Sequence, residues 1–177
     1  MRRYPAVAVV LLVPASFALA LDMPTRKPGL WELKMEFQGR NLPAQLMQQC
    51  TDASTDKLMT LNFGGAADRN CQKREVNNNG DTITIDSVCS FGEATTTSHA
   101  VVSGDFNSAY TVQISSTRQG GRSTPGAAPG GESHMTISAK WLGPCVASQK
   151  PGDVMMGNGM KMNVLDIQKM GGASGRP

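Results

Sequence analysis

The chain has 177 residues, with 17 Lys or Arg and 14 Asp or Glu, so its formal net charge is +3. The charges are interspersed without a basic run, which argues against a nucleic-acid partner and against a polybasic membrane-binding patch. Aromatic residues make up only 5% of the sequence, so a stacking platform for bases or sugars is not expected.

The N-terminus has the pattern of an export signal. Two arginines precede an apolar run over residues 6–18, and Ala18-Leu19-Ala20 fits the small-side-chain rule for signal peptidase. The run is shorter than the ~20 residues of a transmembrane helix, although an uncleaved membrane anchor is the alternative. We expect residues 1–20 to be removed, no membrane span in the remaining chain, and a periplasmic or secreted protein.

The first expected element is a strand in the segment KPGLWELKMEF. Four apolar side chains alternate with charged ones, which is the period of a half-buried strand: Trp31, Leu33, Met35 and Phe37. A second strand is expected at residues 44–50. One short helix should follow it, capped by Thr51 or Ser54, with Asp52 or Asp56 in its first turn.

The rest of the chain alternates strands with turns. Strands are expected at residues 71–76 and 82–90, joined at Asn79-Gly80, because Asn-Gly is a strong hairpin signal. Further strands are expected at residues 94–103, 108–117 and 134–142, with a last hairpin within residues 153–167. The Gly/Pro-rich residues 119–133 predict a flexible loop, and residues 168–177 a disordered tail.

This order of elements predicts a mainly β fold in a single domain over residues 21–167. Seven to nine short strands with hairpin-length turns and one short helix favour an antiparallel up-and-down meander. The meander should form a small barrel or a strongly curved sheet, either of which protects the sheet edges.

Four cysteines behind an export signal predict two disulfides. A zinc site is not indicated, because the sequence has no Cys-x-x-Cys pair and no histidine close to a cysteine. Strand directions in a meander place Cys71 and Cys89 at one end and Cys50 and Cys145 at the other, so these are the expected pairs. An Asn79-Gly80 turn would set Cys71 opposite the residue before Cys89, so a bulge or a longer turn is also required.

No arrangement typical of catalysis is present. His99 and His134 belong to no nucleophile or metal motif, and the sequence contains no G-x-S-x-G. We therefore expect a protein that is not an enzyme and needs no cofactor. An envelope enzyme remains a further hypothesis, which requires polar groups to converge on one of the histidines in a cleft.

A methionine cluster near the C-terminus supports an alternative. Thioethers suit monovalent copper, so a copper-binding or redox-responsive envelope protein would use this set: Met155, Met156, Met160 and Met162. Packing of flexible methionines in irregular parts of the core explains the same pattern.

The leading hypothesis is a non-catalytic binding module. A small barrel either fills with side chains or holds one small ligand. The expected ligand is a small apolar molecule, with an envelope protein as the other candidate partner. The residues expected to face the ligand are Trp31, Met35, Tyr110 and Trp141.

Three short motifs carry a resemblance to a known family. PGLWE at residues 28–32, QCTDA at residues 49–53 and WLGPC at residues 141–145 occur in order, with Cys71 and Cys89 between them. The sequence resembles the exported bacterial family called domain of unknown function thirty-six seventeen. That resemblance implies export, disulfides and one domain, and it supplies no catalytic residue.

Overall fold

The computed structural model describes residues 23–39, 42–64, 70–121 and 131–173. The expected export signal and most of the expected loop at residues 119–133 lie outside these ranges. Within them, nine antiparallel strands form one sheet in the order β3-β4-β5-β6-β7-β1-β2-β8-β9. The elements are β1 Gly29–Gln38, β2 Gln45–Thr51, α1 Ala53–Gly64, β3 Cys71–Asn78, β4 Thr82–Phe91, β5 Ala94–Asp105, β6 Ala109–Gln119, β7 Glu132–Gly143, β8 Asp153–Met156, β9 Lys161–Asn163 and α2 Val164–Ala173.

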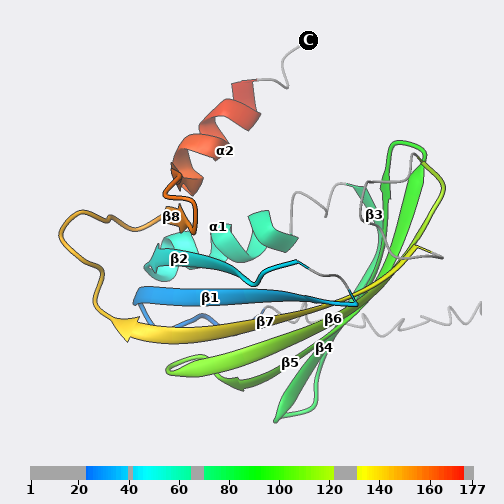
Figure 1. Cartoon of the computed structure of the whole chain (residues 1–177), viewed down its shortest axis with the longest axis horizontal. Helices are drawn as coiled ribbons and strands as arrows, with labels where there is room; N and C mark the ends of the chain where they lie inside the picture. Colours follow the sequence, from blue (N-terminus) through cyan, green and yellow to red (C-terminus); the bar gives the residue numbers. More distant parts are fainter. Residues whose placement is uncertain (1–22, 40–41, 65–69, 122–130, 174–177) are drawn as a thin grey trace, which may run out of the picture.

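The sheet curls strongly but stays open (Figure 1). The predicted mainly β, antiparallel, curved sheet is confirmed, while the closed barrel is not: among the described residues, β3 and β9 each pair with one strand. The up-and-down order holds from β3 to β7, whereas β1 pairs with β7 and β2 with β8. Closure would need β2 to pair with β3. Instead, the outer edge of β2 pairs with β8, through Met47 to Gln49 opposite Val154 to Met156.

The C-terminal part differs from its prediction. The hairpin of β8 and β9 is present, but the chain enters α2 at Val164, so the predicted hairpin ends early and residues 168–173 are helical rather than a disordered tail. The side-chain oxygen of Asn163 accepts from the Leu165 N–H at 3.0 Å, which caps the helix. Two helices are therefore described where one was predicted. Neither is long and apolar enough to cross a membrane.

Both disulfides have the predicted pairing. Cys50 is joined to Cys145 and Cys71 to Cys89. The turn of the β3–β4 hairpin is shifted from the prediction: the Asn79 N–H donates to the Thr82 carbonyl, which leaves Gly80 and the next residue as the two-residue turn. Gly80 has a φ of 88°, as the first position of a type II′ turn requires. A bulge between Cys71 and Lys73 then sets the two cysteines opposite each other.

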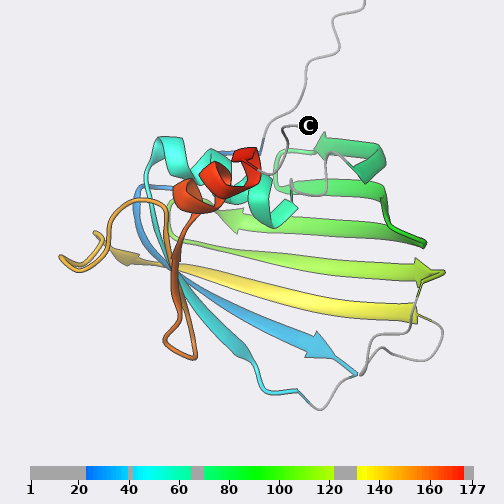
Figure 2. The same cartoon turned by 90° about the horizontal axis from the view of Figure 1, so that it is seen from above.

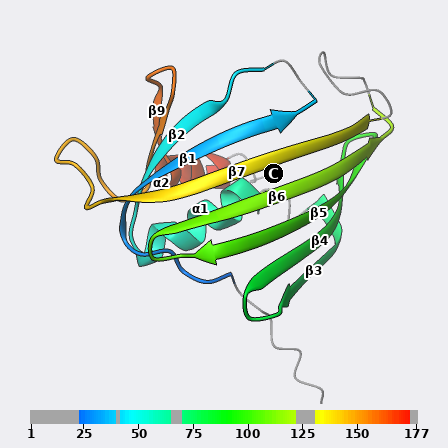
Figure 3. The same cartoon turned by 60° about the horizontal axis from the view of Figure 1, so that its bottom comes forward.

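The two helices lie over the concave face of the sheet, as the view from above shows (Figure 2). In the view with the bottom forward, the convex face is in front and both helices are behind it (Figure 3). The cap of α1 is Asp52 rather than the predicted Thr51 or Ser54. Asp52 Oδ1 accepts from the N–H of Thr55 at 2.8 Å and of Ser54 at 3.1 Å. The cap thus fixes where the helix starts across the concave face.

Two apolar clusters pack between these layers. One joins β2, α1, β8 and α2, through Met47, Met59, Val154 and Val164. The other lies under the start of β1, through Trp31, Leu33 and Ala139. The C-terminal strands and α2 therefore complete the core on one side of the concave face.

Candidate concave binding site

The concave face holds a cavity of about 380 Å³. Its walls come from α1, from β1 to β7 and from the segment before β1. This volume lies within the range of roughly 300–1,000 Å³ that ligand pockets occupy. A small ligand is therefore sterically accommodated.

Strand alternation explains why the cavity walls are mostly apolar. Leu33 and Met35 of β1 face the cavity, while Lys34 between them lies on the other side of the sheet. Residues paired between neighbouring strands lie on the same face of the sheet. Met35 pairs with Ile137 of β7, and Ile137 pairs with Val112 of β6, so all three face the cavity. On β5 the small side chain of Ala100 lines the cavity, between Ile85 of β4 and Ile114 of β6.

One end of the cavity is polar and is built around Arg26. Arg26 is 6% exposed and Asp56 of α1 is 2% exposed. The Arg26 Nε and backbone N–H donate to the two Asp56 carboxylate oxygens at 2.6 and 2.9 Å. The guanidinium also lies 5.8 Å from the centre of the Trp31 ring. The pair ties the segment before β1 to the helix above the cavity.

Two further side chains complete this end. The Arg26 Nη1 donates to Gln49 Oε1 at 2.9 Å, and it lies 3.4 Å from the Tyr110 hydroxyl. The Tyr110 ring stacks on Phe106 at a centroid distance of 4.9 Å. Burial raises the pKa of the Tyr110 hydroxyl, so the group is a neutral donor at neutral pH.

The structure divides the four predicted ligand-facing residues. Met35 and Tyr110 line the cavity. Trp31 is fully buried, and its Nε1 donates to the Lys27 carbonyl at 2.8 Å, so its ring packs beneath Arg26 rather than facing the cavity. Trp141 packs beside Trp31 at the end of the sheet, with the Lys27 Nζ 3.7 Å above its ring. Neither tryptophan is among the lining residues.

Arg26, Gln49 and Asp56 were not singled out by the sequence as site residues. Asp56 gave only the signal of an acid at a helix start, Gln49 appeared only as the first residue of the QCTDA motif, and nothing local marks Arg26. Asp56 lies 30 residues from Arg26 along the chain and Gln49 lies 23 residues from it, so only the folded topology brings the three together.

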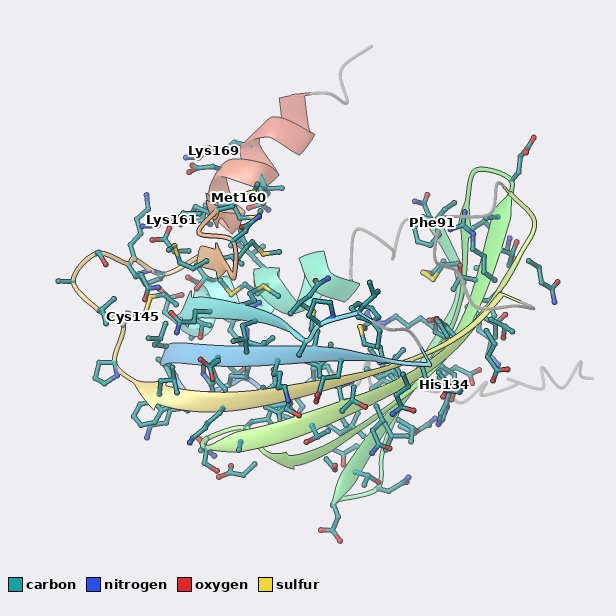
Figure 4. The ribbon with its side chains drawn as sticks, viewed as in Figure 1. Phe91, His134, Cys145, Met160, Lys161 and Lys169 are labelled. Atoms are coloured by element: carbon teal, nitrogen blue, oxygen red, sulfur yellow. A yellow bond between two sulfur atoms is a disulfide. The ribbon has the colours of Figure 1, made fainter. Side chains whose placement is uncertain are left out.

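Both histidines lie on the convex face, outside the cavity. The His99 Nδ1 is 2.7 Å from Asp86 Oδ1. The His134 Nε2 is 3.1 Å from Glu132 Oε1, and its Nδ1 is 3.2 Å from Ser115 Oγ. Acids therefore accompany both histidines, but on exposed strands. Figure 4 shows His134 at the opposite end of the sheet from Cys145.

The C-terminal methionines do not point to one place. Met156 and Met162 pack against the apolar cluster under α2. Met155 pairs with Gln48, and strand alternation puts its side chain on the opposite face of β8 from Met156. Met160 lies beside the turn and is 55% exposed (Figure 4). Within the described ranges, no group of three His, Cys, Asp or Glu side chains is placed to hold a metal ion.

The three sequence motifs meet at the polar end of the cavity. Gly29 has a φ of 135°, and a Cβ there would collide with the Gly143 carbonyl and lie 2.6 Å from the Trp141 Nε1. Gln49 contacts Arg26, and the adjacent Cys50 bonds to Cys145.

A model of the family described as "Protein of unknown function (DUF3617)" matches residues 26–145. The chain belongs to this family. The matched region begins at Arg26 and ends at Cys145, so β8, β9 and α2 lie beyond it. No curated protein and no solved structure matches the chain.

Proposed function

We propose that this protein is an exported, non-catalytic binding module that holds a small apolar ligand in its concave cavity. The observation that carries the proposal is the cavity of about 380 Å³ with mostly apolar walls on an open, curved sheet. Transfer of apolar surface from water into such a site is favourable, by roughly 25 cal/mol per Å² before the costs of association.

Two other features support the proposal. Both disulfides fit an oxidising compartment, as the export signal in the sequence predicts. Methionines contribute to the walls as Met35, Met47 and Met59, and flexible thioether side chains adapt to ligands of different shape.

The test is binding of N-phenylnaphthylamine, an uncharged apolar probe whose fluorescence rises on burial. We expect saturable binding at one site per chain. Ala100→Phe places a ring in the cavity and should abolish probe binding. Val101→Phe adds the same ring on the opposite face of β5 and should leave binding unchanged.

Equal binding by both variants and the parent would show that the probe binds elsewhere and would refute the proposal. So would the absence of any saturable binding by the folded parent protein. If the protein instead co-purifies with an envelope protein and binds no probe, the partner hypothesis replaces this one.

A further inference from the structure

The polar end of the cavity presents hydrogen-bond donors whose described partners are weak acceptors. The Arg26 Nη2 has the Met59 sulfur at 3.8 Å, and the Gln49 Nε2 has the Met47 sulfur at 3.6 Å. A thioether sulfur is a poor acceptor compared with oxygen. Both donor side chains are at least nine-tenths buried, so water cannot fully replace the missing acceptor.

The orientation of these donors follows from their other contacts. Gln49 Oε1 accepts from the Arg26 Nη1 at 2.9 Å, so the amide must direct its NH₂ group the other way. The Tyr110 oxygen lies beside the same guanidinium at 3.4 Å, so its lone pairs face Arg26 and its own proton is available to an acceptor. Three donor groups from β2, β6 and the segment before β1 thus border the cavity together.

The charge of Arg26 is already balanced. Asp56 accepts from both the side chain and the backbone of Arg26 in a buried pair. A second carboxylate beside Arg26 would be a buried charge without its own counter-ion there, which is costly, because the other arginine that lines the cavity, Arg74, belongs to β3 at the far edge of the sheet order. An uncharged oxygen acceptor satisfies the donors without that cost.

Building on the proposed function, we propose that the ligand is an uncharged, carbonyl-bearing lipid of the fatty acyl ester type. Its carbonyl oxygen accepts hydrogen bonds from Arg26, Gln49 and Tyr110. Its aliphatic chain lies along the apolar walls toward Ala100 and Ile114. Met47 and Met59 occupy the acceptor positions when the ligand is absent, and their flexible side chains move aside.

The experiment is competition against N-phenylnaphthylamine by three compounds of equal chain length: a fatty acid methyl ester, the free fatty acid and the hydrocarbon. At a pH where the acid is ionised, we expect the ester to bind more tightly than both others. A lysophospholipid with the same acyl chain separates two sources of the ester. Equal binding of that compound indicates a membrane-derived lipid, and preference for the methyl ester indicates a free ester; both agree with the proposal.

Tyr110→Phe keeps the ring and removes one donor. The preference for ester over hydrocarbon should fall by about threefold to tenfold, as loss of a single hydrogen bond predicts. Thr111→Val removes a hydroxyl from the opposite face of the same strand and should leave the preference unchanged. Arg26 is not used for this test because its removal would leave Asp56 buried without a partner.

Tighter binding of the ionised acid than of the ester would overturn the proposal. An ester preference that is unchanged in Tyr110→Phe would overturn it too. In both cases the proposed function would still stand if the parent binds the probe and Ala100→Phe abolishes that binding. Failure of the ester proposal can therefore be told apart from failure of the proposed function.

Discussion

The two disulfides should differ in their contribution to stability, because they close loops of very different length. Cys50–Cys145 spans 95 residues and Cys71–Cys89 spans 18. The chain-entropy model gives about 4.7 kcal/mol for the first bridge and about 3.2 kcal/mol for the second, a difference of about 1.5 kcal/mol.

The structure gives a second reason why Cys50–Cys145 should stabilise the fold more than Cys71–Cys89. Cys50 is the last residue but one of β2 and Cys145 follows β7, while β1 lies between these two strands. The bridge therefore holds three strands together at the polar end of the cavity. Cys71–Cys89 joins only neighbouring residues of one hairpin at the sheet edge.

The assay is equilibrium unfolding in urea, without reductant, of two double variants. Cys50→Ala with Cys145→Ala should unfold at a lower urea concentration than Cys71→Ala with Cys89→Ala. At an m-value of about 2 kcal/mol per M, the midpoints should differ by about 0.7 M. Equal midpoints, or a lower midpoint for the hairpin variant, would refute the argument from loop length.

Three further substitutions test other parts of the structure. Asp56→Ala should destabilise the fold by about 3–5 kcal/mol in urea unfolding, because it leaves the Arg26 charge buried and unpaired; combining it with Arg26→Met should recover part of the loss. Gly29→Ala should lower the melting temperature more than Gly39→Ala, since both residues have positive φ but only Gly29 has backbone in the way of a Cβ; equal effects would contradict this reading. Hydrogen bonds lower the pKa of the Asp52 carboxyl in the folded protein, first that from the Thr55 N–H and then those from the nearby hydroxyls and the Ser54 N–H. The stabilisation by the ionised Asp52 is therefore present above the pKa of the unfolded state and is lost as the pH falls through the pKa of the folded state. Asp52→Ser keeps a capping oxygen without that titration, so the difference in urea midpoint between the parent and this variant should shrink as the pH is lowered from about 6 to about 3; a constant difference would contradict it.

The sequence predicted features that depend on local pattern and on strand parity. Alternation located β1 and the cavity-facing Met35, and the reversal of direction at each strand was enough to pair Cys50 with Cys145. Closure was not predictable in this way. Whether the sheet forms a barrel depends on which strand pairs with the outer edge of β2, and that strand comes from residues 153–156.

The site was less predictable than the fold because its polar end is made by long-range contacts. Trp31 was expected to face a ligand on the strength of its size and its strand position. In the structure, Trp31 is fully buried beneath Arg26, which removes more apolar surface from water than a place beside the cavity would. The smaller Tyr110 ring lines the cavity instead. A buried arginine gives no periodic signal, so the sequence offered no local reason to choose Arg26.

The motifs that carry the family resemblance share one physical role. Gly29 allows β1 to approach the end of β7 closely, and the bridge from Cys50 to Cys145 holds β2 to that same end. Trp31 and Gln49 then contact the Arg26 guanidinium from below and from the side. These residues build the frame of the polar end, whereas the cavity walls on β3 and β4 include Arg74 and the Cys71–Cys89 disulfide beside apolar and small polar side chains. The segment KPGLWELKMEF is accordingly both structural and part of the site: Trp31 supports the donor cluster, and Leu33 and Met35 continue from it into the apolar cavity.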